Sequence, residues 1–245
     1  PKFNIKFISV EVTNKCTLNC RDCCALMPYQ QQDARKNMDM DITVKSIEKV
    51  VDCVDFIPEL SIIGGEPFLN PDLKKVLTGL NQDKFKRKIG NFVISTNGTL
   101  VPDLETMQAM SRLKNHMYIY ISVYGKLSTR TYELLRICNQ HGIACIICKN
   151  KSWAPMCKPF NPNEGGYSLE ETCENCSKCT FEKFTQFRIA EERLYKCVFL
   201  SFGELGRVIP ADKRNSLDIL NEEFSSDILK KYLDSFQPGR IYCSQ

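Results

Sequence analysis

The sequence has 245 residues, a net charge of +4 at pH 7 and 14 cysteines. Its length is typical of one domain, or of one domain with a small appendage. The charge is spread along the chain, so we expect neither nucleic acid nor a membrane surface as a partner. No apolar run approaches a membrane span and no signal-peptide pattern is present, so we expect a cytoplasmic protein. The first residue is Pro1 rather than Met, as in a trimmed fragment.

The cysteine content has two explanations. Disulfide frameworks belong to short secreted chains that lack a sufficient core, whereas this chain is long and rich in apolar periodic segments. Thiolates that bind metal or iron–sulfur centres in a reducing cytoplasm are therefore favoured. Because the only histidines are His116 and His141, we do not expect a site built on histidine.

The first 150 residues alternate between strand-like and helix-like patterns. The expected strands are residues 3–13, 59–67, 89–98, 117–125 and 142–150, and the expected helices are residues 41–54, 71–80, 102–114 and 128–140. We expect Asn70 to cap the second helix, with Pro71 in its first turn. This alternation implies a parallel sheet with right-handed crossovers.

Ligand sites in such folds lie at the C-terminal ends of the strands. Four unusual stretches fall at those ends in this sequence. They are "NKCTLNC" after the first strand, "GGEP" after the second, "STNG" after the third and "SVYG" after the fourth. We therefore expect these four stretches to surround one site.

The composition changes after residue 150, where prolines, "NEGG" and "CENCSKC" replace the alternation. A hairpin-like stretch follows at residues 184–199, then "SLDIL" at 216–220 and an amphipathic helix near 222–236. We interpret the chain as two units, a core at residues 1–154 and a small cysteine-rich extension at residues 155–245.

The strongest signal is the loop Cys16-x3-Cys20-x2-Cys23 after the first strand. Three thiolates can hold three corners of a four-iron cube and leave one iron open. The spacing resembles the signature of the radical S-adenosylmethionine (SAM) superfamily. The alternative is a zinc knuckle, for which the adjacent Cys24 is poorly placed as a fourth ligand.

The resemblance implies an α/β fold, a partial (β/α)5-6 barrel similar to a TIM barrel. It also implies a [4Fe–4S] cluster with SAM on the open iron. One electron from the cluster would cleave SAM to a 5'-deoxyadenosyl radical that abstracts hydrogen from the substrate.

The same resemblance assigns roles to the other strand ends. The residues implied to hold SAM are Gly64, Gly65, Glu66, Pro67, Ser95, Thr96, Asn97 and Ser122. Glu66 would accept a charge-assisted hydrogen bond from the SAM ammonium, and Tyr124 would face the substrate. Asp22 stands where the family usually has an aromatic residue, so only its backbone would contact adenine.

A second cysteine group resembles the SPASM and twitch extensions, which carry auxiliary iron–sulfur clusters. Cys179, Cys197 and Cys243 match three twitch positions, and "SLDIL" resembles the helical segment before the final cysteines. The fourth position would fall at 246. Either the chain is clipped there, or Cys176 or Cys173 supplies the thiolate, or the auxiliary [4Fe–4S] cluster has an open iron. A tetrahedral zinc site is the alternative.

The remaining cysteines fall into two groups. We expect core positions on apolar helix faces or strands for Cys53, Cys138, Cys145 and Cys148. Cys157 is ambiguous, because epimerases of the superfamily use a cysteine as hydrogen donor. It joins Tyr124 as a candidate catalytic residue.

The compact size and the single expected auxiliary cluster resemble superfamily members that oxidise aminocyclitols. They imply an oxidoreductase that abstracts hydrogen from a sugar, nucleotide-sugar or polyol, and then oxidises the alcohol or epimerises it. An electron donor such as flavodoxin or ferredoxin is an implied partner. One alternative is a peptide maturase that forms thioethers or epimers, and another is a non-catalytic zinc-binding module.

Overall fold

The computed structural model describes residues 2–21, 23–149 and 186–235. Six residues of the predicted sites lie outside these ranges, namely Asp22, Cys157, Cys173, Cys176, Cys179 and Cys243. Among the helices of the described ranges, none is long and apolar enough to cross a membrane.

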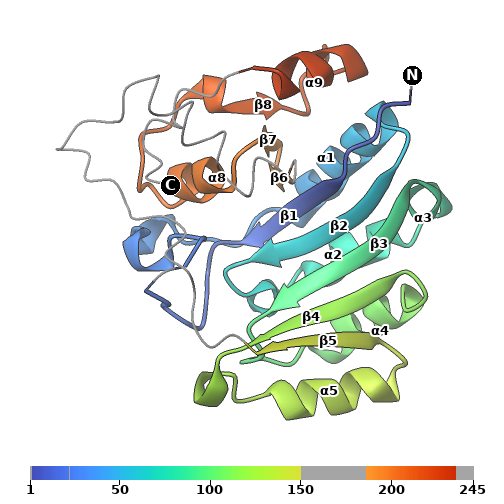
Figure 1. Cartoon of the computed structure of the whole chain (residues 1–245), viewed down its shortest axis with the longest axis vertical. Coiled ribbons are helices and arrows are strands. Elements are labelled where there is room, and N and C mark those ends of the chain that lie inside the picture. The colour runs from blue at the N-terminus through green and yellow to red at the C-terminus, as the bar shows by residue number, and fades with distance from the viewer. Residues whose placement is uncertain (1, 22, 150–185, 236–245) are drawn as a thin grey trace.

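The described residues form an eight-stranded sheet in the order β5-β4-β3-β2-β1-β6-β7-β8. The strands are β1 (Phe7–Thr13), β2 (Ile57–Gly64), β3 (Ile89–Thr96), β4 (Met117–Val123), β5 (Ala144–Lys149), β6 (Gln186–Ala190), β7 (Arg193–Tyr195) and β8 (Ser216–Asp218). From β5 to β6 all neighbours run parallel, whereas β6, β7 and β8 are joined antiparallel. Figure 1 shows these strands fanned from β5 up to β8. The predicted α/β fold with a mostly parallel sheet is confirmed.

The α-helices connect and cover these strands. They are α1 (Met40–Cys53), α2 (Leu73–Leu80), α3 (Asp83–Lys88), α4 (Leu104–Arg112), α5 (Thr131–Gln140), α8 (Val198–Leu205) and α9 (Ser226–Leu233). In Figure 1, α1, α2 and α4 lie behind the strands, and α8 lies on the near side close to β6 and β7.

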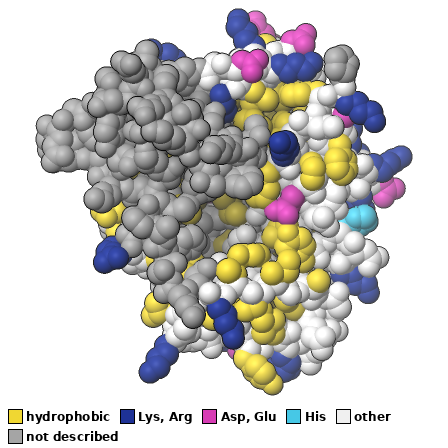
Figure 2. Space-filling model, viewed as in Figure 1, with side chains coloured by type: hydrophobic (Ala, Val, Ile, Leu, Met, Phe, Trp, Pro, Cys, Tyr) yellow, Lys and Arg dark blue, Asp and Glu magenta, His cyan; other side chains and the backbone are white. Residues whose placement is uncertain are grey.

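The two faces of the sheet differ because side chains alternate along each strand. Ile8, Val10 and Val12 of β1 are buried in the main core between the sheet and the helices. The opposite, inner face is polar at the intervening positions, which include Ser9, Glu11, Ser61, Ser95, Ser122 and Arg188. Toward β4 and β5 this face shows hydrophobic side chains (Figure 2), and Ile146, opposite Tyr120 on this face, is about half exposed.

The second helix begins later than predicted. It begins at Leu73 after Asp72, so the prediction that Asn70 caps it was wrong. The Asn70 side chain instead accepts a hydrogen bond from Asp72 N (2.9 Å) and donates one to Val12 O (2.7 Å). Asn70 therefore ties the loop after β2 to the end of β1, and Pro71 precedes the helix rather than opening it.

The predicted hairpin of the extension is confirmed, since β6 and β7 pair antiparallel. The helical interpretation of "SLDIL" was wrong, because residues Ser216–Asp218 form β8, with Leu217 opposite Leu194 of β7. Helix α8, directly after Cys197, was not predicted. Because β6 pairs with β1, the extension continues the main sheet. The boundary at 154/155 lies between described segments and stays a prediction.

Candidate active site

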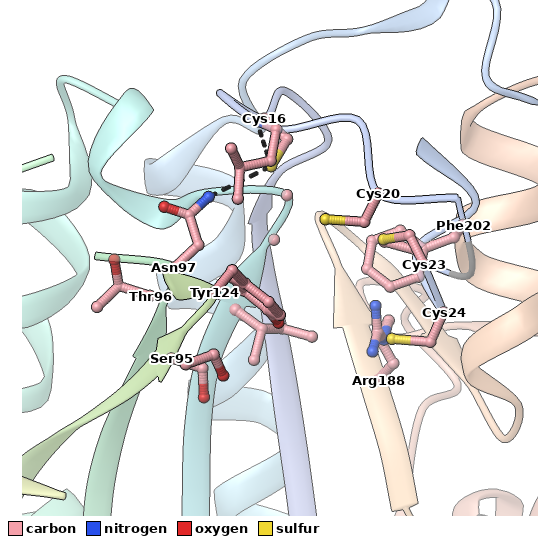
Figure 3. A pocket seen from close by; sticks show the side chains of 16 residues that line it. Cys16, Cys20, Cys23, Cys24, Ser95, Thr96, Asn97, Tyr124, Arg188 and Phe202 are labelled. Atoms are coloured by element: carbon pink, nitrogen blue, oxygen red, sulfur yellow. Dashed lines mark hydrogen bonds between the residues drawn. The ribbon is translucent and has the colours of Figure 1, made fainter. Parts of the chain in front are cut away.

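A cavity of about 200 Å³ lies at the C-terminal ends of β1 to β4. Cys16, Cys20 and Cys23 of the loop after β1 line it. Ser95, Thr96, Asn97, Ser122 and Tyr124 line it from the ends of β3 and β4, and Arg188 and Phe202 face them from β6 and α8 (Figure 3). The fold thus brings the four strand-end stretches to one site.

The three loop thiols are partly buried in this cavity. Burial raises the pKa of Cys16 to about 11, and it also raises the pKa of Cys20 and of Cys23 above the ordinary thiol value. Without a bound cation the thiols are therefore protonated at neutral pH. A metal centre would displace those protons, because its charge favours the thiolate.

The spacing of the thiols bears on which metal centre fits. A zinc ion with bonds of about 2.3 Å draws its thiolates to within roughly 4 Å of one another. Within the described residues, no three His, Cys, Asp or Glu side chains are gathered tightly enough to hold a single ion. In an iron–sulfur cluster each thiolate binds a different iron. Three thiols that line one cavity match the three protein ligands of a four-iron cluster with one open iron.

The "GGEP" turn packs directly against the cysteine loop. Gly65 N donates to Thr13 O (2.9 Å) and Glu66 N donates to Lys15 O (2.8 Å). A Cβ atom on Gly65 would lie 2.2 Å from Lys15 O and 2.8 Å from Cys16 Cβ. The contact with the loop is by itself enough to require glycine here.

Glu66 does not line the cavity, although the sequence predicts that it binds the SAM ammonium. Its buried carboxylate accepts hydrogen bonds from Thr96 Oγ1 (2.8 Å) and Asn97 N (2.8 Å), and burial raises its pKa to about 7. Pro67 is also buried outside the cavity lining. The Glu66 carboxylate therefore holds the "STNG" turn, and the contacts of Glu66 and Pro67 with SAM stay predictions.

Asn97 links the "STNG" turn to the cysteine loop. Its Nδ2 lies 3.6 Å from Cys16 Sγ and donates to Thr17 Oγ1 at 3.1 Å, while its Oδ1 accepts from Thr99 N (Figure 3). An N–H group directed at a ligand sulfur is one of the means by which proteins tune iron–sulfur centres.

Ser128 is a connecting residue that sequence reasoning missed. Its Oγ donates to Asn97 O (2.6 Å) and accepts from Tyr124 N (2.9 Å), so it joins the ends of β3 and β4. A serine near a predicted helix start is too common a pattern to reveal this role.

The wall made by β6 and α8 was also missed. Arg188 has 5% side-chain exposure, and its guanidinium stacks 4.0 Å from the centre of the Phe202 ring. Arg188 Nη1 lies 3.6 Å from Glu11 Oε2, and Ser201 Oγ donates to the same oxygen (2.9 Å). Burial raises the pKa of Glu11 to about 7, against the opposing effects of Arg188 and Ser201. The available signal was an arginine between two large apolar residues, Phe187 and Ile189.

The other cysteines divide by location. Cys24 lines the cavity beside Arg188, and burial raises its pKa to about 11 (Figure 3). Cys138 is fully buried as predicted, whereas Cys53, Cys145 and Cys148 are only half-buried. Cys197 precedes α8 and packs on a small apolar cluster outside the cavity lining.

Comparisons with known proteins agree with this geometry. The model of the Radical SAM superfamily matches residues 10–148. A GTP 3',8-cyclase of Clostridium acetobutylicum is 30% identical over 41% of this chain and 30% of its own length. An uncharacterised protein of Methanocaldococcus jannaschii is 29% identical over 40% of this chain and 32% of its own length. The chain thus matches about a third of each of these relatives.

The fold is similar to the solved structure of native anSMEcpe with bound AdoMet, with a TM-score of 0.55 and 13% sequence identity. The alignment covers 97% of this chain and 82% of the anSMEcpe chain. At that identity the likeness shows the fold. The fold and the site together define an enzyme with a partial α/β barrel and a thiol-lined cavity. The chain belongs to the radical SAM superfamily. Its cofactors are SAM and a [4Fe–4S] cluster, and the zinc-binding module considered above is set aside.

Proposed function

We propose that the protein is a radical SAM oxidoreductase that abstracts hydrogen from a sugar, nucleotide-sugar or polyol, and that it oxidises the alcohol or epimerises it. The supporting observation is the density of hydroxyl groups at the cavity. Tyr124 lines it on the substrate side, next to Ser95 and Ser122, which this proposal shares with SAM, and Ser61 Oγ lies 3.4 Å from Ser95 Oγ. Such groups can both donate to and accept from substrate hydroxyls.

In this proposal Cys16, Cys20 and Cys23 bind the cluster. When bound, the cluster and SAM supply a 5'-deoxyadenosyl radical after one-electron transfer. The residues that orient SAM are Gly64, Gly65, Ser95, Thr96, Asn97 and Ser122, with the backbone of Asp22 against adenine. Glu66 fixes Thr96 and Asn97 in place through the hydrogen bonds described above.

Oxidation of an alcohol to a ketone removes two electrons and two protons. The radical would take one hydrogen atom from the carbinol carbon, the hydroxyl proton would leave to water, and the second electron needs an acceptor. We assign it to an auxiliary cluster on Cys179, Cys197 and Cys243, with Cys176 or Cys173 as the further ligand. A flavodoxin or ferredoxin would supply the first electron, and Cys157 would return hydrogen in an epimerisation.

The test uses the full chain, reconstituted with iron and sulfide under anaerobic conditions and supplied with SAM and dithionite. We expect 5'-deoxyadenosine together with a ketone or epimer from one compound in a panel of sugars, nucleotide-sugars and polyols. C23A should lose SAM cleavage and about half of the iron–sulfur absorbance at roughly 400 nm, because the auxiliary cluster remains, whereas C24A should keep both. If the enzyme cleaves SAM but modifies only peptides, the alternative function, a peptide maturase, replaces this proposal.

A further inference from the structure

Arg188 is a buried cation whose hydrogen-bonding capacity is largely unused. It lies in the middle of β6 and lines the cavity, and its side chain is only 5% exposed. Within the described part of the chain, neither its Nε nor its Nη1 has a hydrogen-bond partner. Buried polar groups are almost always satisfied, so two guanidinium nitrogens without a partner, on a side chain that lines a cavity, point to a ligand.

Glu11 does not fill that role. The separation of 3.6 Å between Glu11 Oε2 and Arg188 Nη1 is too long for a hydrogen bond, and Ser201 already donates to that oxygen. The guanidinium is always charged. Burial raises the pKa of Glu11 to about 7, so near neutral pH Glu11 only partly balances this charge. Among the described residues that line the cavity there is no aspartate or glutamate.

The guanidinium is also fixed in orientation. Phe202, fully buried on α8, covers one of its faces at 4.0 Å, and Figure 3 shows the group beside Cys24, across the cavity from Ser95 and Tyr124. Such a planar group can offer Nη1 and the adjacent Nη2 side by side to two oxygens of a carboxylate or a phosphate. Because its position is set by packing, little side-chain freedom is lost on binding.

We propose that Arg188 binds a carboxylate or phosphate group inside the cavity, presented either by the substrate or by the carboxylate of SAM. The inference rests on the proposed function and narrows its substrate class. If the substrate carries the anion, nucleotide-sugars, sugar phosphates and sugar acids are preferred over neutral polyols.

The experiment measures anion binding by calorimetry on the reconstituted full chain. Inorganic phosphate is titrated into the protein with and without SAM, and SAM is compared with decarboxylated SAM, which lacks the carboxylate. R188Q should lower the affinity for the ligand that carries the anion by about tenfold to a hundredfold, which is the usual effect of losing a charge-assisted hydrogen-bonded pair. E11Q should bind it at least as tightly as wild type. R214Q, at an exposed arginine paired with Asp212, is the matched control and should change nothing.

The pattern of results identifies the source of the anion. If phosphate still binds to the SAM-loaded protein and R188Q abolishes this binding, the substrate presents the anion. If R188Q weakens SAM but not decarboxylated SAM, the cofactor presents it. Unchanged binding of both phosphate and SAM in R188Q overturns the proposal.

Two further points keep the test decisive. R188Q leaves the buried Glu11 without its cationic neighbour and can destabilise the fold, so E11Q/R188Q, which removes both charges, is measured alongside. Formation of 5'-deoxyadenosine by the wild type tests the proposed function separately. Failure of that reaction with intact anion binding, or the reverse, shows which of the two proposals is wrong.

Discussion

Two buried carboxylates lie on the two sides of the cavity, and burial raises the pKa of each to about 7. Glu66 accepts hydrogen bonds from the "STNG" turn and acts as a fixed connector. Glu11 is hydrogen-bonded by Ser201 and lies near Arg188, and its Oε1 has no partner in the described residues. The two glutamates thus have different roles, because different groups surround their carboxylates.

The raised pKa of Glu11 predicts a pH-dependent stability. Its folded-state pKa of about 7 exceeds the ordinary value of 4.5, so the folded protein binds the proton more tightly and loses stability as pH rises between those values. From pH 5 to 8 this loss amounts to about 2 to 3 kcal/mol. In E11Q the decline should be smaller by that amount in urea unfolding. Parallel pH profiles for wild type and E11Q would contradict this.

A methyl group at Gly65 should displace the cysteine loop. In G65A the new Cβ meets the carbonyl oxygen of Lys15, which is backbone and cannot move aside cheaply. We expect the iron content after reconstitution to fall from roughly eight toward roughly four per chain, because the auxiliary cluster is unaffected. G79A is the control, since its Cβ meets only side-chain atoms of Val44 at 3.0 Å or more. Equal iron content in the two variants would show that the loop tolerates the shift.

At the scale of elements, the strands and their polar ends could be predicted from the sequence because their signals are local. Alternation along Phe7–Thr13 and the glycines of "GGEP" act within a few residues. The wall formed by β6 and α8 could not be predicted. The position of Arg188 at the site depends on its proximity to Glu11, which lies far earlier in the chain. Residues Ser216–Asp218 of "SLDIL" form a strand because they pair with the edge of β7. Pairing overrides local propensity in such segments.

Ser128 joins two elements and offers a test of that connection. S128A leaves Asn97 O and Tyr124 N without their shared partner, so the ends of β3 and β4 should loosen. We expect a loss of about 1 to 2 kcal/mol in stability and a severalfold weaker affinity for SAM in calorimetry. S111A, which removes a hydrogen bond to His141 on the outer helices, should leave SAM affinity unchanged. Equal effects on SAM affinity would remove Ser128 from the site.

At the scale of the whole molecule, the sheet carries the cofactor site and the extension on one framework. Two four-iron clusters require roughly eight irons per chain. If Cys197 binds the auxiliary cluster, C197A should retain roughly four irons and still cleave SAM. Roughly eight irons in C197A would exclude Cys197 as an essential ligand, and roughly twelve in the wild type would indicate a second auxiliary cluster.

The position of β1 at the centre of the sheet has a consequence for how the chain is made. β1 is synthesised first, and β2 can cover one of its edges early, but its other edge pairs with β6, which emerges from the ribosome much later. Until then the growing polypeptide exposes a row of unpaired backbone groups, the kind of edge that invites aggregation. During that interval Glu11 also lacks its cationic neighbour, Arg188 of β6. Co-expression of a chaperone that shields nascent chains should therefore increase the yield of folded protein.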